Sequence, residues 1–250
     1  MKHLFSLIIF SLFLSFNFGY SQVLNHEFGV SIGAVSIQSD YGESGDFAST
    51  YGNVGFGAGL AYYVSIGEYQ KRWNDKTDFI KSHFRAKLET NYIQSNFTHK
   101  GKRIESTSTE SIKSAALKGS TKIYNFGGQL EYTFFEMTED SKFAPFLSIG
   151  GYYVLYDPEL TSELGDWKDN PSLLPNDYLN GSVHLQKDKT QSITFGAGTR
   201  FKINNLLMVF DLKWQRFLTD NIDGFAPLNG SNKSKDWLFL AQVGAVFKLN

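Results

Sequence analysis

The chain has 250 residues, a formal net charge of −1 and 16% aromatic residues, with 23 glycines against 5 prolines. The absence of cysteine excludes a disulfide framework and thiolate metal sites. The nearly neutral charge gives no reason to expect nucleic acid as a partner. Many aromatic residues and few prolines are typical of a protein built from β-sheet.

The N-terminal segment reads MKHLFSLIIFSLFLSFNFGYSQ and has the three parts of a secretory signal peptide. A basic Lys2 precedes an apolar run. The small residues Gly19 and Ser21 favour cleavage between Ser21 and Gln22. The run is shorter than the roughly 20 apolar residues that a membrane-spanning helix needs, which disfavours the alternative of an uncleaved anchor. We therefore predict a signal peptide at residues 1–21 and one mature domain over residues 22–250.

After this segment, apolar and polar residues alternate with a period of two in eight separate places, which is the pattern of a half-buried strand. In SHFRAKLETNYI, Phe84, Leu88 and Tyr92 share one face and Arg85 and Lys87 share the other. Each segment has roughly the length that a tilted strand needs to cross a bilayer. The eight predicted strands are residues 26–36, 54–64, 82–93, 123–134, 145–155, 192–203, 206–217 and 236–249.

The connections between these strands alternate in length. Asn204-Asn205 suits a two-residue hairpin, and the gap at 135–143 is also short. The charged gap at 66–81 is longer than a periplasmic turn and fits least well. Long loops on one side and short turns on the other are typical of an up-and-down barrel in an outer membrane. The long polar gaps are residues 37–53, 94–121, 157–190 and 218–235.

The two faces of the strands distinguish a membrane barrel from a water-soluble barrel of the lipocalin type, which turns its apolar face inward. One face carries bulky apolar residues, and the other mixes glycines with charges of both signs. We predict that the apolar face meets lipid and that the charges pair inside as a plug rather than a pore. The predicted interior charges are Glu27, Arg85, Lys87, Glu89, Glu131, Arg200, Lys202, Asp211 and Lys213.

Aromatic residues near the strand ends predict two belts at the headgroup levels of the membrane. Ordinary aromatic preference for strands would scatter them instead. The outer belt is predicted at Tyr92, Tyr124, Tyr153, Trp214 and Trp237, and the inner belt at Tyr62, Phe84, Phe134, Phe201 and Phe247.

The segments HEFGVSIGAVS, SDYGESGDF, YGNVGFGAGLAYYV and the final WLFLAQVGAVFKLN resemble small outer-membrane barrels of gliding and related bacteria. These include OmpA/OmpX-like barrels and PorG-like proteins linked to type IX secretion. The resemblance covers the mature chain as architecture and transfers no functional residue. It implies an outer-membrane location in a Gram-negative bacterium and a periplasmic secretion or motility assembly as a partner, beside lipid and lipopolysaccharide. The last residue is Asn250 rather than the aromatic residue that ends many such proteins.

No catalytic, cofactor or metal constellation emerges from the sequence. Outer-membrane enzymes that act on lipid A need a nucleophile, a base and an acid together. His99 and His184 have Ser95 and Ser182 nearby in the sequence, but no shared spacing joins a serine, a histidine and an acid. Two acidic stretches lack calcium-loop spacing and are predicted to be solvated loops that face lipopolysaccharide. They are Asp40, Glu43 and Asp46, and Glu163, Asp166 and Asp169.

Three functions remain open at this point. The first is a non-catalytic scaffold, for which the 66–81 connection is the predicted docking segment if it is periplasmic. The second is a lipid A-modifying enzyme, and the third is a narrow pore. The composition of the chain identifies no ligand and no cofactor.

Overall fold

The structure is a computed structural model that describes residues 24–38, 53–66, 79, 83–179, 181–204, 206–225 and 236–249, except for 136–141. The predicted signal peptide at 1–21, most of the acidic loop at 37–53 and nearly all of the 66–81 connection lie outside the described residues. No helix in the described part of the chain is long and apolar enough to cross a membrane.

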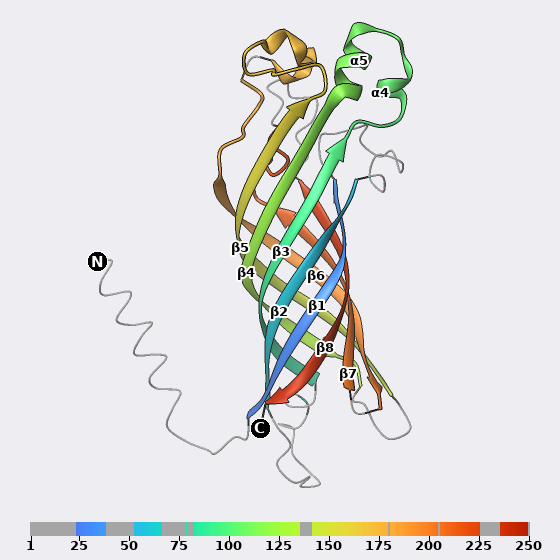
Figure 1. The fold of residues 1–250 in the computed structure, drawn as a ribbon. Coiled ribbons are helices and arrows are strands. Elements are labelled where there is room, and N and C mark those ends of the chain that lie inside the picture. Colours follow the sequence, from blue (N-terminus) through green and yellow to red (C-terminus); the bar gives the residue numbers. More distant parts are fainter. Residues whose placement is uncertain are drawn as a thin grey trace, which may run out of the picture.

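Eight antiparallel strands, each hydrogen-bonded to its neighbours in sequence, form a closed barrel in which β1 also pairs with β8. This confirms the predicted eight-stranded antiparallel up-and-down barrel (Figure 1). The strands are β1 (Leu24–Gln38), β2 (Val54–Ile66), β3 (Phe84–Thr98), β4 (Leu117–Thr133), β5 (Phe143–Ser162), β6 (Asp188–Ile203), β7 (Leu206–Phe217) and β8 (Trp237–Leu249).

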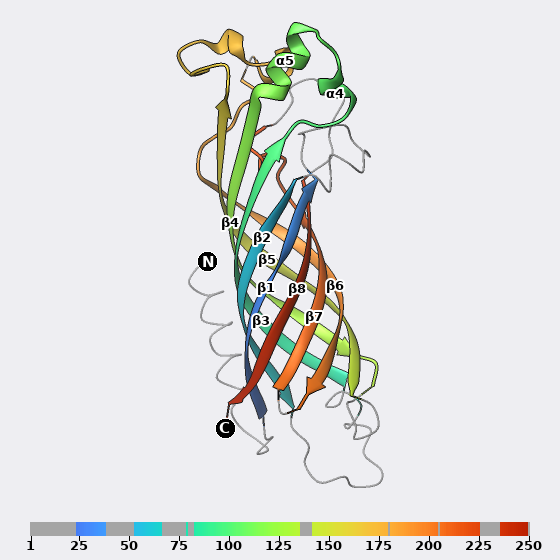
Figure 2. The same cartoon turned by 45° about the vertical axis from the view of Figure 1, so that its right-hand side comes forward.

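The two ends of the barrel differ. The start of β1, the end of β8 and the tight β6–β7 turn lie at one end, here called the inner end (Figure 1). The outer end carries two short helices, α4 (Lys102–Glu105) and α5 (Thr109–Ala116), and the 3-10 turns η1 (Pro171–Leu173) and η2 (Asn176–Tyr178). Figure 2 shows that β3, β4 and β5 rise above the other strands to carry these helices.

The predicted outer connections at 94–121 and 157–190 are partly wrong. β3 continues to Thr98 and β4 already begins at Leu117, while β5 continues to Ser162. The helices between β3 and β4 were not expected from the sequence. The Ser108 hydroxyl caps α5 by accepting a hydrogen bond from the Ser111 backbone at 3.2 Å, which explains where that helix begins.

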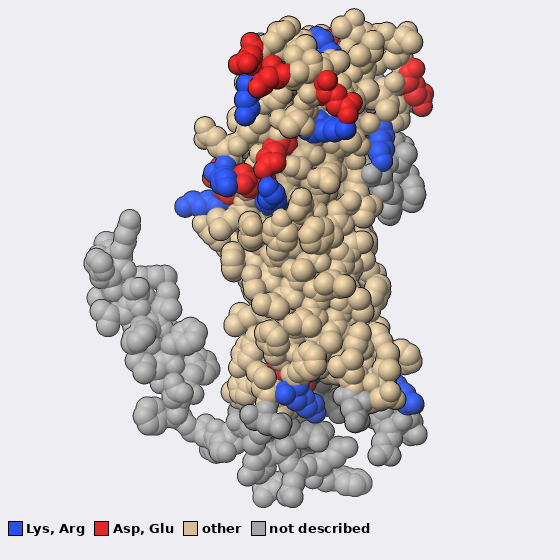
Figure 3. Space-filling model, in the orientation of Figure 1, with Lys and Arg blue, Asp and Glu red and all other residues tan. Residues whose placement is uncertain are grey.

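The outward and inward faces match the prediction over the middle of the barrel. Leu88 is 61% exposed, whereas its neighbours Lys87 and Glu89 are 2% and 5% exposed. Apolar side chains therefore cover the outside and charged side chains fill the inside, so the lipocalin-type alternative is wrong. On the face seen in Figure 3, charged residues gather near the two ends and leave the middle uncharged.

Aromatic rings pair across neighbouring strands near both ends of the uncharged band, as predicted. Tyr92 lies 5.1 Å from Tyr124 at the outer level, between ring centroids. Phe143 lies 6.4 Å from Phe201 at the inner level. Ring contacts thus link neighbouring strands at each level, as expected for aromatic belts.

Candidate functional site

The centre of the barrel holds a buried network of alternating charges contributed by β3 and β7. Lys87 Nζ lies 3.3 Å from Glu89 and 3.2 Å from Asp211. Lys213 Nζ contacts both carboxylates, at 2.5 Å from Glu89 and 3.6 Å from Asp211. Two amines thus neutralise two carboxylates, which is the condition for holding charges away from bulk solvent.

Two further ion pairs lie closer to the inner end. Arg200 pairs with Glu131, and its guanidinium lies 4.6 Å from the centre of the Phe146 ring. Arg85 Nη1 pairs with Glu27 at 2.7 Å. All the predicted interior charges are therefore inside except Lys202, which is exposed. That residue stands one position before the end of β6, where the barrel no longer encloses its side chain.

A layer of uncharged polar groups continues the network toward the outer end. The amide of Asn125 donates to Asn91 at 2.8 Å and to Gln215 at 3.2 Å, and Gln215 donates to Ser192 at 2.8 Å. The Tyr152 hydroxyl ties one more amide to the charges, because it donates to Glu89 and accepts a hydrogen bond from Gln129 at 2.6 Å. The predicted ion pairs inside the barrel are thus confirmed, and amides extend them toward the outer end; the plug rather than a pore stays a prediction.

Above the amides, the barrel interior becomes apolar. This outer cluster combines inward-facing strand residues with residues of the outer loops, and it encloses the rings of Phe97, Tyr178 and Phe225. The described side chains therefore close the outer end with apolar packing, which was not predicted from the sequence. The members are Val35, Ile37, Ile93, Phe97, Leu117, Ile123, Tyr152, Val154, Tyr156, Leu160, Leu174, Tyr178, Phe217, Ile222, Phe225, Leu238 and Leu240.

Several atoms of the polar interior have no hydrogen-bond partner among the described residues. Two of them, Ser148 Oγ and Asp211 Oδ1, lie beside Gly196. A Cβ added to that glycine would stand 2.4 Å from the serine oxygen and 3.3 Å from the aspartate oxygen, so both atoms face the same small space. Buried polar atoms of this kind in proteins bind ordered water. The ion-pair layers are therefore the part of the interior best suited to hold water. The other atoms are Gln129 Oε1, Glu131 Oε1 and Arg200 Nε.

The serine and histidine residues considered for catalysis lie at the outer end, in separate contacts. The Ser95 hydroxyl donates to the Asn53 carbonyl at 3.5 Å, and the Ser182 hydroxyl donates to the Leu179 carbonyl at 2.9 Å. His99 is buried, with Nε2 2.9 Å from the Tyr178 hydroxyl, whereas His184 is exposed. Both serine hydroxyls thus donate to backbone carbonyls rather than to a histidine.

The acidic stretches give no metal centre in the described part of the chain. Glu163 pairs with Lys118, and Asp166 accepts a hydrogen bond from the Lys168 backbone at 2.9 Å. No group of three or more His, Asp or Glu side chains is placed to hold a metal ion among the described residues. Asp40, Glu43 and Asp46 lie outside those residues.

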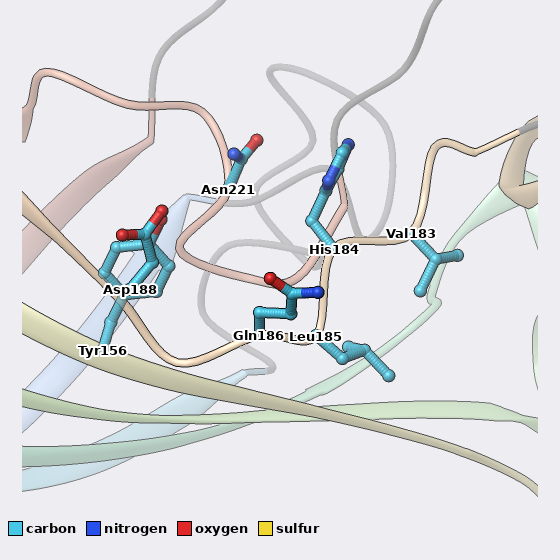
Figure 4. Close-up of a pocket in the computed structure, with 7 residues that line it drawn as sticks. All are labelled: Tyr156, Val183, His184, Leu185, Gln186, Asp188 and Asn221. Atoms are coloured by element: carbon cyan, nitrogen blue, oxygen red, sulfur yellow. The ribbon is translucent and has the colours of Figure 1, made fainter.

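A pocket of about 350 Å³ opens in the outer mouth of the barrel (Figure 4). It lies where the inward face of β5 meets the start of β6 and the segment before it. Sequence reasoning missed it, because its residues come from three separate segments and follow no motif. The lining residues are Tyr156, Val183, His184, Leu185, Gln186, Asp188 and Asn221.

No protein-family model and no curated protein sequence matches the chain. Among solved structures, Neisserial surface protein A is 9% identical with a TM-score of 0.47, over 90% of this chain and 97% of that one. A major outer membrane protein from Thermus thermophilus is 14% identical with a TM-score of 0.47, over 90% and 99%. The outer membrane enzyme PagL is 11% identical with a TM-score of 0.38, over 89% and 99%. Identities this low assign neither a family nor an activity to the chain.

Proposed function

We propose that the protein is an outer-membrane β-barrel of a Gram-negative bacterium, exported by a signal peptide at residues 1–21. The observation that carries this proposal is the closed barrel with apolar side chains outside and ion pairs inside. A closed barrel satisfies every backbone group of its wall internally, as lipid requires. Barrels with an apolar band between aromatic belts are the spanning structures of bacterial outer membranes.

Cell fractionation and gel mobility test this proposal together. We expect the mature protein to sediment with outer membrane, to begin at Gln22 and to migrate faster in SDS gels before boiling than after it. Recovery in the soluble periplasmic fraction, with a mobility that heat does not change, contradicts the proposal. N-terminal sequencing of the recovered protein tests the cleavage site separately.

The role that we propose for this barrel is non-catalytic and structural: it presents loops and turns to other proteins. Its interior supports this, because ion pairs, amides and an apolar cluster fill the described lumen and offer packing rather than an aqueous channel. The partner that the sequence resemblance implies is a periplasmic secretion or motility assembly. The docking segment proposed for it is the 66–81 connection.

A pull-down from cross-linked cells tests the scaffold role. Arg72→Glu with Trp73→Ala is expected to reduce recovery of periplasmic partners, because it changes charge and removes an aromatic anchor in the proposed docking segment. The matched control is Lys168→Ala, an exposed lysine of the opposite end. Equal recovery from all three proteins counts against docking through this segment.

Two measurements address the other candidate functions. Mass spectrometry of lipid A from cells with and without the protein is expected to give identical spectra, and a mass shift that depends on the protein supports an enzyme instead. Planar-bilayer recordings are expected to show no steady conductance. A reproducible single-channel current supports the pore alternative.

A further inference from the structure

The pocket in the outer mouth is built from three segments that converge from different parts of the chain. Tyr156 projects from the inward face of β5, and Asp188 lies opposite it as the first residue of β6. Figure 4 shows these two side by side, with Val183 and Leu185 of the preceding segment across the pocket from them. Asn221, from the connection after β7, completes the lining.

Packing and backbone hydrogen bonds fix the walls of this pocket. Val183 forms a bridge with Phe225, and the His184 backbone donates to the Gly224 carbonyl at 2.9 Å. Gly224 has a φ of 83°, and a Cβ there would lie 2.8 Å from Leu185 Cδ2. Only glycine fits this close approach without strain. The pocket therefore exists before any ligand arrives, which lowers the entropy cost of binding.

The floor of the pocket is apolar. Val183 and Leu185 pack against the outer apolar cluster, to which Tyr156 belongs. Burial raises the pKa of Tyr156, whose hydroxyl also hydrogen-bonds with Thr219. This floor suits the CH groups of a small molecule rather than a strongly hydrated ion.

The rim of the pocket is polar, and its described lining residues include no lysine or arginine; their one basic group is the imidazole of His184. Asn221 and Gln186 each provide an amide that donates and accepts, and Asp188 provides acceptors. The neighbouring Lys187 is 80% exposed and pairs instead with Asp157 at 2.8 Å. Groups that both donate and accept match hydroxyls, which do the same, while the negative charge of the Asp188 carboxylate disfavours phosphates and carboxylates.

We propose that this pocket binds a neutral, hydroxyl-rich molecule of the size of a mono- or disaccharide. Its volume of about 350 Å³ falls within the range of small-molecule sites. Hydroxyls of the ligand bond Asn221, Gln186 and Asp188, and its CH face packs on Leu185 and Val183. This binding function is additional to the proposed scaffold role and does not depend on it.

Two-dimensional NMR of the ¹⁵N-labelled protein in phosphocholine micelles tests the proposal, because these micelles have no sugar headgroups to compete. The neutral probes are the methyl glycosides of glucose, galactose and mannose, and N-acetylglucosamine. At least one is expected to give saturable shifts in the Asn221 and Gln186 side-chain amides, with a millimolar Kd. Asn221→Ala with Gln186→Ala is expected to weaken that binding about tenfold, because two hydrogen bonds are lost.

The matched control is Lys187→Met, which changes the adjacent side chain that points away from the pocket and is expected to leave the Kd unchanged. Each variant must keep the heat-dependent gel mobility of the folded barrel. The proposal is overturned if no neutral probe gives saturable shifts, if glucose 6-phosphate binds more tightly than glucoside, or if the double variant binds like wild type. None of these results bears on the membrane location or the partner pull-down.

Discussion

Glu131 on β4 and Arg200 on β6 are buried side chains that pair inside the lumen, and each compensates the charge of the other. Glu131 is 0% exposed and Arg200 is 1% exposed, so bulk solvent does not screen either one. Pairs of this kind often add little net stability relative to apolar residues of the same volume. Their removal one at a time is costly, because the remaining charge is left buried without a partner.

We therefore predict opposite outcomes for single and double changes at this pair. Glu131→Gln is expected to lower the free energy of unfolding by about 3–5 kcal/mol, whereas Glu131→Leu with Arg200→Met is expected to recover most of that loss. Urea titrations of the refolded barrel in micelles measure all three proteins. A double variant that is less stable than the single variant would show that the pair contributes more than mutual neutralisation.

Gly127 and Gly128 are adjacent on β4 but face opposite sides of the wall, and this gives a matched pair of substitutions. A Cβ on Gly127 would lie 2.1 Å from the Gly151 carbonyl oxygen, whereas one on Gly128 would lie 3.4 Å from Leu88. Gly127→Ala is expected to cost about 1–3 kcal/mol through overpacking. Gly128→Ala is expected to be neutral or slightly stabilising. Equal unfolding midpoints for the two variants would contradict this reading of the lumen side.

At the scale of the strand, β3, β4 and β5 change character along their length. In the lower part the outward residues are apolar, while near Phe97, Leu117 and Leu160 the inward residues are apolar and buried. The outward neighbours there, such as Asn96 and Glu159, are exposed and polar. In their lower part these strands thus turn apolar residues outward, as a lipid-facing strand does. In their upper part they turn polar residues outward and apolar residues inward, as a strand in water does, and the hydrogen bonds between strands continue through both parts.

This reversal explains how much of the fold could be predicted from the sequence. All eight strands are predicted, because the lipid-facing alternation is strong over segments such as 82–93 and 206–217. The upper ends of β3–β5 are instead predicted as loops, because their apolar residues continue on the opposite face and break the expected pattern. The mouth pocket is missed for a different reason: Tyr156, Asp188 and Asn221 meet only after the barrel has closed.

The lipid-facing part of β3 gives a prediction that depends on membrane depth. Leu88 lies midway between the belt residues Phe84 and Tyr92 and is 61% exposed. Leu88→Lys is expected to lower the stability of the barrel in bilayers by about 2–4 kcal/mol, the cost of a lysine near the midplane. The control Asn96→Lys, outward on the same strand but above the outer belt, is expected to cost far less. Folding titrations in phospholipid vesicles compare the stabilities of the two variants. Equal losses of stability would contradict a membrane midplane at the level of Leu88.

At the scale of the whole molecule, the barrel interior contains two separate apolar regions. The outer cluster unites strand residues with the loops that close the mouth, and a smaller cluster around Tyr63 and Phe146 lies toward the inner end. The amide layer stands between them, while the ion pairs adjoin the smaller cluster: the Arg200 guanidinium lies 4.6 Å from the centre of the Phe146 ring and 5.7 Å from that of Tyr63. Because the described outer loops pack on the outer cluster, while the barrel wall is hydrogen-bonded all the way round, the two should open with different free energies.

Tyr178 provides the test of this separation. Its ring stacks on Phe225 with centroids 3.9 Å apart, and its hydroxyl lies 2.9 Å from His99 Nε2. Tyr178→Ala should therefore leave a cavity that costs about 3–5 kcal/mol within the outer loops. Limited proteolysis is expected to cut residues 163–187 at least tenfold faster, while the heat-dependent gel mobility of the barrel stays unchanged; the exposed control Lys168→Ala alters neither. If Tyr178→Ala instead abolishes the gel shift, the loops and the wall unfold as one cooperative unit, and the polar layers do not divide the molecule.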